Sequence, residues 1–333
     1  MNFIKKHYFT LAIFACTGCA YLFPDPFLGI GDFKFTQLVG PLLMVIMFGM
    51  GTTLSPGDFF RIAKMPLPVF TGAFLQFAIM PLTGFMLAKA FDLEPELAAG
   101  TIMIGSVAGG AASNVMAYIA RANVALSVTM TCVSTFLAPL LTPLMMQLWA
   151  GKFVEISALD MAIAIIKLTI IPVVAGLATH LLLKKQFEER RKTMDAVLSF
   201  ISKTGICIIL AVMIAPERDK LKEAGLLLLA VAAIHNAVGL FAGYWLTRAL
   251  GIAGAKIAAC LGIGNGARSL VNEEDCRTVA IEVGMQNGAM GTALANKFIS
   301  STAALVPNVF GVWMDISGSL LAKWWSSRPP TQK

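Results

Sequence analysis

The chain has 333 residues, of which 57% are hydrophobic and only 14% are charged, and its mean hydropathy is +0.76. Soluble domains carry about 25% charged residues, so the composition excludes an ordinary soluble protein and predicts an all-α polytopic membrane protein. The formal net charge of +7 does not indicate nucleic-acid binding, because membrane proteins collect Lys and Arg in their cytoplasmic loops.

Ten apolar stretches are long enough to cross a bilayer as helices, which takes about 17 to 25 residues when tilt is allowed for. The first five lie at about 8–23, 36–53, 67–91, 95–119 and 123–149. The second five lie at about 157–183, 193–215, 224–250, 277–297 and 299–324. The first stretch has no convincing signal-peptide cleavage site after it, so we expect it to be retained as the first transmembrane helix.

Basic residues are distributed unevenly between the loops on the two sides of these spans. If the N-terminus lies inside, the outer loops hold only Lys34, Lys89, Lys152, Arg218, Lys220, Lys222 and Lys297. The positive-inside rule therefore predicts that both termini lie in the cytoplasm. The short tails and the lack of a targeting segment lead us to expect a bacterial inner membrane.

The two halves of the chain align with each other. Residues 84–91 align with 243–250, and 105–109 align with 284–288. Five spans in each half give the halves opposite orientations, so we predict an inverted repeat with one unit at 1–150 and the other at 151–326. The second unit carries an extra stretch near Ala253 to Val271, where we expect a surface helix or a re-entrant turn.

A polar run interrupts the ninth span and contains Glu282, Gly284, Gln286, Asn287 and Gly288. A charged side chain at the bilayer centre costs on the order of 3 kcal/mol or more, so such residues mark functional sites by default. Glycines and amides favour an interrupted helix, and interrupted helices form the binding sites of many secondary transporters. The run therefore predicts a transporter with its site at this break.

The aligned run from Gly105 to Asn114 predicts a second break, which would meet the first near the bilayer midplane. Helix N-termini suit an anionic substrate, whereas unwound carbonyls and side-chain oxygens suit a cation. Ser127 and Thr131 in the fifth span are spaced i, i+4 and share one face of a helix. Hard cations take several oxygen ligands, which for sodium would come from Ser106, Ser113, Asn114, Ser127, Thr131, Glu282, Gln286 and Asn287.

Each feature also has a purely structural interpretation. The Gly-x-x-x-Gly spacings at 105–109 and 284–288 are helix-packing motifs, and Ser or Thr hydroxyls often bond back to their own helix. His235 in the eighth span can be a hydrogen-bonded core residue rather than a ligand. Cys16 and Cys19 have no second pair or His cluster, so we predict no metal or redox centre. Glu282 is the residue for which a functional role is favoured.

The string from Glu282 to Asn287 resembles the ninth-helix signature of the bile acid:sodium symporter family. The runs Gly109 to Val115 and Asn123 to Ser127 resemble its counterpart in the fourth and fifth helices. The resemblance covers nearly the whole chain. It implies a panel domain of helices 1, 2, 6 and 7 at about 8–53 and 157–215, and a core domain of helices 3 to 5 and 8 to 10 at about 67–149 and 224–324. The fourth and ninth helices would cross at their unwound centres.

The resemblance also implies two sodium sites beside a substrate site. The first sodium would be bound by Ser113, Asn114, Ser127, Thr131 and Glu282. The second would be bound by Gln76, the Glu282 carboxylate and the carbonyls of Val283, Met285 and Gln286. The substrate would lie between core and panel near Ala111, Ala112, His235, Asn287 and Gly288. Ala111 stands where some members carry a hydroxyl residue, so that hydrogen bond is not expected.

These observations predict a sodium-coupled symporter that imports an organic anion by alternating access, acts as a monomer and needs no cofactor apart from sodium. The favoured substrate is a small 2-hydroxy or 2-keto acid such as pantoate, ketopantoate or pyruvate, and a bile acid is the alternative. A proton-coupled antiporter would use paired intramembrane carboxylates, and only Glu282 is securely deep. A membrane-embedded enzyme would need a second catalytic group near Glu282, and the sequence offers none.

Overall fold

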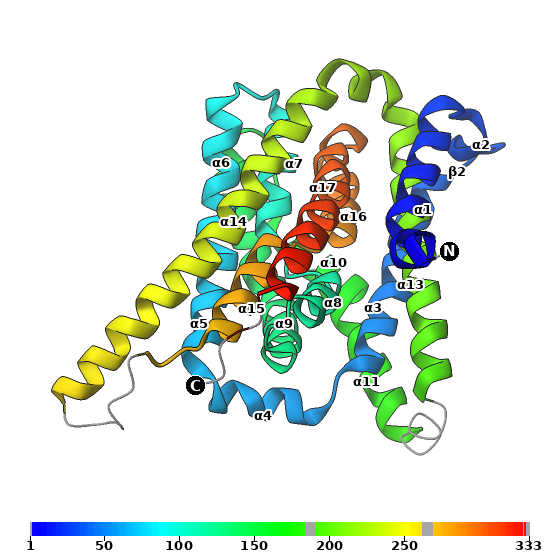
Figure 1. The fold of residues 1–333 in the computed structure, drawn as a ribbon. Helices are drawn as coiled ribbons and strands as arrows, with labels where there is room; N and C mark the ends of the chain where they lie inside the picture. Colours follow the sequence, from blue (N-terminus) through cyan, green and yellow to red (C-terminus); the bar gives the residue numbers. More distant parts are fainter. Residues whose placement is uncertain (1, 184–190, 262–268, 329, 331–333) are drawn as a thin grey trace.

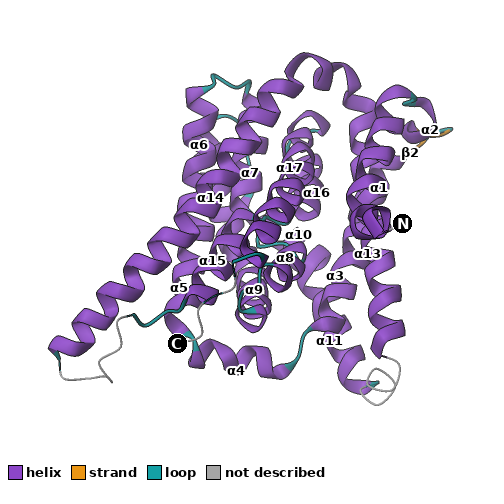
Figure 2. Cartoon of the chain, in the orientation of Figure 1, coloured by secondary structure: helices purple, strands orange, loops and turns teal. Residues whose placement is uncertain are grey.

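A computed structural model describes residues 2–183, 191–261, 269–328 and 330, and this part of the chain is almost entirely helical (Figure 2). The described strands are β1 (Gly29–Ile30) and β2 (Phe33–Lys34), which form an antiparallel hairpin. Within the described residues, six helical segments are long and apolar enough to cross a membrane, namely Phe35–Thr53, Pro66–Ala90, Val124–Lys152, Ala158–Leu182, Ala196–Cys260 and Ser301–Ser326. The protein is therefore a multi-pass membrane protein.

The first half of the chain is a series of helices joined by short connections. In order they are α1 (Asn2–Leu22), α2 (Asp25–Leu28), η1 (Phe35–Leu38), α3 (Val39–Thr53), α4 (Pro56–Lys64), α5 (Pro66–Phe74), η2 (Leu75–Ile79), α6 (Met80–Ala90), α7 (Pro95–Ser106), α8 (Ala112–Ile119), α9 (Val124–Trp149) and η3 (Ala150–Lys152).

The second half continues in the same way. Its elements are α10 (Ala158–Ile165), η4 (Ile166–Ile170), α11 (Ile171–Leu182), α13 (Arg191–Ile214), η5 (Ala215–Glu217), α14 (Arg218–Cys260), α15 (Glu273–Gly284), α16 (Gly288–Phe298) and α17 (Ser301–Ser326). The stretches predicted from hydropathy fall largely on helical residues, but 95–119 and 277–297 are each interrupted by a non-helical segment, and 224–250 is part of the longer α14.

The helices form two groups (Figure 1). One group contains α1, α3, α11 and α13, and α3 lies between α11 and α13 with contacts to both. The other contains α5 to α9 and α14 to α17, with the long α14 packed along α15 and α17. The helix α4 crosses below and joins α3 of the first group to α5 of the second (Figure 1). Within the first group, α3 and α11 touch backbone to backbone, because a Cβ on Gly51 would lie 2.1 Å from the carbonyl oxygen of Val173.

Two helices contain a π-helical turn followed closely by proline. The turn η2 precedes Pro81, and the turn η4 precedes Pro172. Proline lacks the N–H that would close the regular i→i−4 hydrogen bond, so the preceding turn widens. In η2 this irregularity carries Gln76 inward, where its side chain is 3% exposed.

The extra stretch near Ala253 to Val271 differs from the expectation. Its first part forms no separate surface helix or re-entrant turn, because α14 continues without a break to Cys260. The segment from Gly251 to Cys260 contains four alanines, which favour a helix, and no proline to stop it. Residues 262–268 lie outside the described residues, and α15 begins after Asn272, which accepts a hydrogen bond from the backbone N–H of Asp275.

Candidate ion and substrate site

Two helix breaks lie side by side at the centre of the second group. The helix α7 ends at Ser106 before α8, and α15 ends at Gly284 before α16. The unwound segments pair in antiparallel fashion: the N–H of Gly110 donates to the Met285 carbonyl at 3.1 Å, and the N–H of Asn287 donates to the Ala108 carbonyl at 2.9 Å. Backbone groups that leave the helices therefore satisfy one another away from water.

Glycine is required where the two segments meet. A Cβ on Gly109 would lie 2.9 Å from Glu282 Oε1, and a Cβ on Gly110 would lie 2.6 Å from the carbonyl oxygen of Gln286. Both distances are shorter than the contacts that real Cβ atoms make. The glycines of the first break thus allow its backbone to reach the carboxylate and the backbone of the second break.

The carboxylate of Glu282 is the centre of a buried cluster of oxygen atoms. Its side chain is 2% exposed. Ser127 Oγ donates to Glu282 Oε2 at 2.8 Å, and Thr131 Oγ1 donates to Glu282 Oε1. The Asn114 Oδ1 lies 2.8 Å from Ser127 Oγ and 3.5 Å from Thr131 Oγ1. Ser113 lies beside the carboxylate, and its Oγ donates to the Gly110 carbonyl at 2.7 Å, so all five residues predicted for the first sodium site come together.

This cluster holds more acceptors than protons. Each hydroxyl has one proton to donate. Ser127 Oγ has two acceptors within reach, Asn114 Oδ1 and Glu282. Thr131 Oγ1 has three, namely Asn114 Oδ1, Glu282 and the carbonyl of Ser127. Among the described residues, no Lys or Arg forms an ion pair with Glu282. A buried carboxylate without a cationic partner is strongly unfavourable. The arrangement therefore suits a bound cation.

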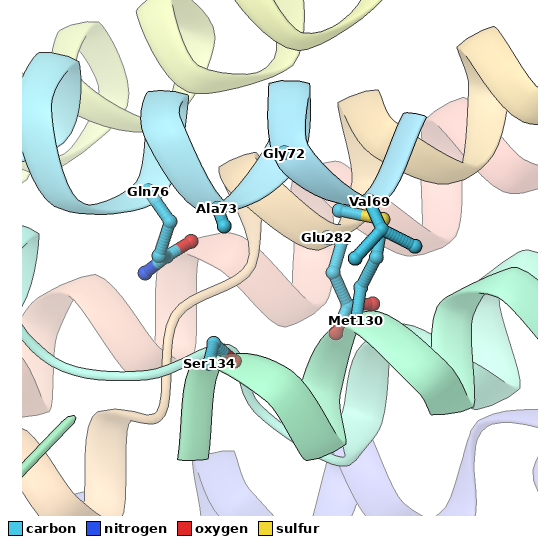
Figure 3. A pocket seen from close by; sticks show the side chains of 7 residues that line it. All are labelled: Val69, Gly72, Ala73, Gln76, Met130, Ser134 and Glu282. Atoms are coloured by element: carbon cyan, nitrogen blue, oxygen red, sulfur yellow. The ribbon is translucent and has the colours of Figure 1, made fainter. Parts of the chain in front are cut away.

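A second polar cluster adjoins the first. Gln76 Nε2 donates to the Val107 carbonyl at 2.6 Å and to Gln286 Oε1, while Gln286 Nε2 donates to the Val283 carbonyl at 2.7 Å. Gln76 and Glu282 line a cavity of about 10 Å³ (Figure 3), which is the space of about one water molecule. The three carbonyls predicted for the second sodium each accept a hydrogen bond, that of Val283 from Gln286 Nε2, that of Met285 from the N–H of Gly110 and that of Gln286 from the N–H of Gly288. Each keeps a second lone pair.

Ser134 also belongs to this site, although the sequence analysis did not single it out. It lines the same cavity (Figure 3), and its Oγ accepts a hydrogen bond from the N–H of Gly109 at 3.2 Å. Ser127, Thr131 and Ser134 are spaced i, i+4, i+7 on α9 and therefore share one face. That spacing is the signal by which Ser134 could have been found.

The residues predicted to contact substrate are only partly brought together. Asn287 caps α16 by accepting the N–H of Met290 at 3.0 Å, and its Nδ2 lies 3.9 Å from Met47 Sδ on α3. Asn287 thus lies where the two helix groups meet. Gly288 follows it, and across the paired segments Ala111 and Ala112 lie at the start of α8, with Ala111 exposed.

His235 contacts α6 and α17. It is fully buried, its Nε2 lies 2.9 Å from the carbonyl oxygen of Met80, and its ring packs edge-on against Phe310. These contacts fit the alternative interpretation of His235 as a core residue that joins α14 to α6 and α17.

Comparison with known proteins gives consistent matches. The model of the Sodium Bile acid symporter family matches residues 40–224. An uncharacterized sodium-dependent transporter, YocS of Bacillus subtilis, is 35% identical over 316 residues, covering 95% of this chain and 89% of the relative. A probable chloroplastic sodium/metabolite cotransporter of Oryza sativa, BASS1, is 33% identical over 96% of this chain and 73% of its own length.

A human relative extends the comparison to a named substrate class. The ileal sodium/bile acid cotransporter of Homo sapiens is 30% identical over 273 residues, covering 82% of this chain and 73% of the relative. The family match and the relatives agree in kind, because all are sodium-coupled transporters and none is an enzyme. The chain belongs to the sodium bile acid symporter family and is a sodium-dependent transporter.

Proposed function

We propose that the protein imports a small 2-hydroxy or 2-keto acid, such as pantoate, ketopantoate or pyruvate, together with sodium. The observation that carries the proposal is the Glu282 cluster, a buried carboxylate whose neighbours are acceptor oxygens. A cation at this place would neutralise the carboxylate and would be coordinated by the oxygen lone pairs that have no proton to accept. Sodium is the cation that the chain's family membership supports.

Two sodium ions would share Glu282. One would be bound by Ser113, Asn114, Ser127, Thr131 and Glu282. The other would occupy the small cavity beside Gln76, Ser134 and Glu282, with further oxygens from Val283, Met285 and Gln286. Because both ions need the same carboxylate and both touch the paired breaks, their binding would stabilise one arrangement of the breaks and so couple to the substrate.

The substrate would bind where the two helix groups meet. The N-termini of α8 and α16 both lie at the breaks, and helix N-termini favour a carboxylate. Asn287, Gly288, Ala111 and Ala112 would line this space. The human relative is named as a bile acid cotransporter, so a bile acid is the competing substrate for a test of pocket size.

The proposal includes an architecture. Ten membrane helices would form two inverted repeats, 1–150 and 151–326. The panel would be 8–53 with 157–215, and the core would be 67–149 with 224–324. The matching breaks before α8 and α16 support the repeat. The core would rock against the panel in a bacterial inner membrane with both termini inside, driven by about 2.3 kcal/mol per charge per 100 mV from the electrical gradient.

Uptake into proteoliposomes tests the proposal directly. We expect labelled pantoate to accumulate under an inward sodium gradient and not under an equal potassium gradient, because only sodium would fill the Glu282 cluster. Taurocholate added as a competitor reports whether the pocket also admits a steroid. If sodium stabilises the protein against heating but no small acid is taken up, the ion sites stand and the substrate assignment is wrong.

The hydroxyls of α9 give a finer test. The Thr131→Val substitution keeps the shape of the side chain and removes one oxygen that contacts Glu282. We expect the apparent affinity for sodium to fall about 10-fold to 100-fold, since a hydrogen bond to a charged group contributes about 1.5 to 3 kcal/mol and the lost ligand is of comparable strength. The measurement is the sodium dependence of uptake.

Thr129→Val is the matched control on the same helix. Thr129 is buried and its hydroxyl donates to the Ala125 carbonyl of its own helix at 2.8 Å. We expect this variant to keep the sodium affinity of the unmodified protein. Equal losses in both variants would mean that the hydroxyls of α9 support the helix and do not bind sodium.

A further inference from the structure

Asp315 is a buried carboxylate at the level of the second break. On α17, Gly311 lies against Gly288, because a Cβ on Gly288 would be 3.4 Å from Gly311 Cα. About two turns further along, Gly318 lies against Met285, because a Cβ on Gly318 would be 2.7 Å from Met285 Sδ. Asp315 is spaced i+4 from Gly311 and i−3 from Gly318, so it lies on the same side of α17, between the two contacts.

Asp315 also faces the other helix group. Val312, one turn before it, packs on the apolar cluster of Ile13 from α1 with Cys207 and Leu210 from α13. The carboxylate therefore lies on the boundary between the two helix groups, which is where the substrate is proposed to bind.

This carboxylate lacks a partner in the described part of the chain. Asp315 is 8% exposed, and its Oδ1 makes no hydrogen bond with any described residue. None of the ion pairs among the described residues involves it. The Nδ2 of Asn287 is nearly as poorly satisfied, since its contact is the weak acceptor Met47 Sδ at 3.9 Å. Buried polar atoms without partners are rare in folded proteins and costly.

The Asp315 carboxylate can accept a hydrogen bond and the Asn287 amide can donate one, and both residues lie at the level of the second break. Together they favour a ligand with the complementary groups. Such a ligand carries an acceptor for Asn287 and a donor for Asp315, both beside the helix N-terminus that favours its carboxylate. A 2-hydroxy acid has this pattern, because its hydroxyl can donate. A 2-keto acid has only acceptors at the same carbon and would turn its lone pairs towards the carboxylate.

We propose that Asp315 is a specificity-determining residue that accepts a hydrogen bond from the substrate hydroxyl and selects 2-hydroxy acids over 2-keto acids. The proposal rests on the proposed function and narrows its substrate class. Sites built to hydrogen-bond a substrate hydroxyl reject analogues that lack it far more strongly than apolar pockets reject a size change. The role is one of selection and requires Asp315 to be ionised, since a protonated carboxyl would donate to a keto oxygen instead. The two sodium ions proposed at Glu282 would offset part of the negative charge of Asp315 and of the substrate.

Competition between matched acids tests this role. Unlabelled pantoate and ketopantoate differ only in the oxidation state of one carbon, and lactate and pyruvate form a second such pair. Against labelled pantoate uptake, we expect the hydroxy acid of each pair to compete at least about 10-fold more strongly than the keto acid. A ratio near one, or a preference for the keto acid, overturns the proposal without any variant.

The variant Asp315→Asn tests whether Asp315 determines the ratio between competition by the hydroxy acid and competition by the keto acid. The amide can accept from a hydroxyl and donate to a keto oxygen, so we expect the ratio to fall to within about 3-fold, while sodium still stabilises the protein against heating. Ser319→Ala, one turn away on α17, should keep the full ratio. An unchanged ratio in Asp315→Asn overturns the proposal.

The outcomes separate this inference from the proposed function. Sodium-driven pantoate uptake without discrimination would remove the role of Asp315 and leave the transport of small acids intact. If no small acid is taken up while sodium still stabilises the protein through Glu282, the substrate class is wrong and the role of Asp315 is wrong with it.

Discussion

Replacing Glu282 with glutamine is expected to abolish sodium-driven uptake, with a loss of at least about 100-fold. The amide has nearly the volume of the carboxyl group, so packing is preserved. It removes the negative charge that two sodium ions would share and replaces one acceptor oxygen with a donor NH₂. A buried bound cation without its counter-charge would be destabilised by several kcal/mol, which corresponds to at least this change, since about 1.4 kcal/mol is a factor of ten.

Two measurements report this effect, namely the initial rate of uptake at saturating substrate and the rise in melting temperature on adding sodium. Binding to the native state raises the melting temperature by mass action, so the sodium-induced rise should vanish in Glu282→Gln. Glu274→Gln is the matched control, because Glu274 is a half-buried carboxylate in the first turn of the same helix, α15. Sodium-driven uptake that survives Glu282→Gln would refute the assignment of the ion site.

The second large effect is expected from Gly110→Ala. The added methyl group would lie 2.6 Å from the carbonyl oxygen of Gln286, and Gly110 also donates to the Met285 carbonyl at 3.1 Å. The obstacle is backbone, which cannot rotate away as a flexible side chain can. Overpacking of this kind costs about 1 to 3 kcal/mol. The paired breaks must move apart, and we expect the apparent sodium affinity to fall at least 10-fold because the ligands on the two breaks separate.

Gly151→Ala is the matched control for this substitution. Gly151 lies in η3, and a Cβ there meets no atom within 4 Å. We expect it to keep the melting temperature and the sodium affinity of the unmodified protein. Thermal unfolding with and without sodium, followed by uptake at graded sodium concentrations, makes the comparison. Gly110→Ala with unchanged sodium affinity would show that close contact between the breaks is not needed for ion binding.

Much of the site could be predicted from the sequence because membrane burial penalises polar groups. Glu282, Gln286 and Asn287 stand out in an apolar span for that reason, and the glycines around them indicate a helix break. Ser127 and Thr131 follow from the i, i+4 spacing of a helix. The end of α14 was not predictable from hydropathy, because the Ala-rich residues after Leu250 can extend a helix in water as well as in lipid.

The roles of His235 and Asp315 required the packed structure. Both are ionisable residues within apolar spans, but only His235 is a candidate for the site from the sequence. Each has one buried polar atom without a hydrogen bond among the described residues, His235 Nδ1 and Asp315 Oδ1. The other ring nitrogen of His235 lies against the Met80 carbonyl inside one helix group, whereas Asp315 lies at the boundary between the groups. Hydropathy cannot distinguish these cases, since it measures burial and carries no information about partners.

The sequence by itself determined the apolar spans, the two helix breaks and the family of this protein, because these depend on hydropathy, backbone propensity and motifs within short stretches of chain. The tertiary structure alone decided which side chains meet. Ser127 and Glu282 are 155 positions apart, and Gln76 and Gln286 are 210 apart. Such contacts arise only when packing brings α5 to α9 against α14 to α17, and no periodicity in the chain encodes a distance of that kind.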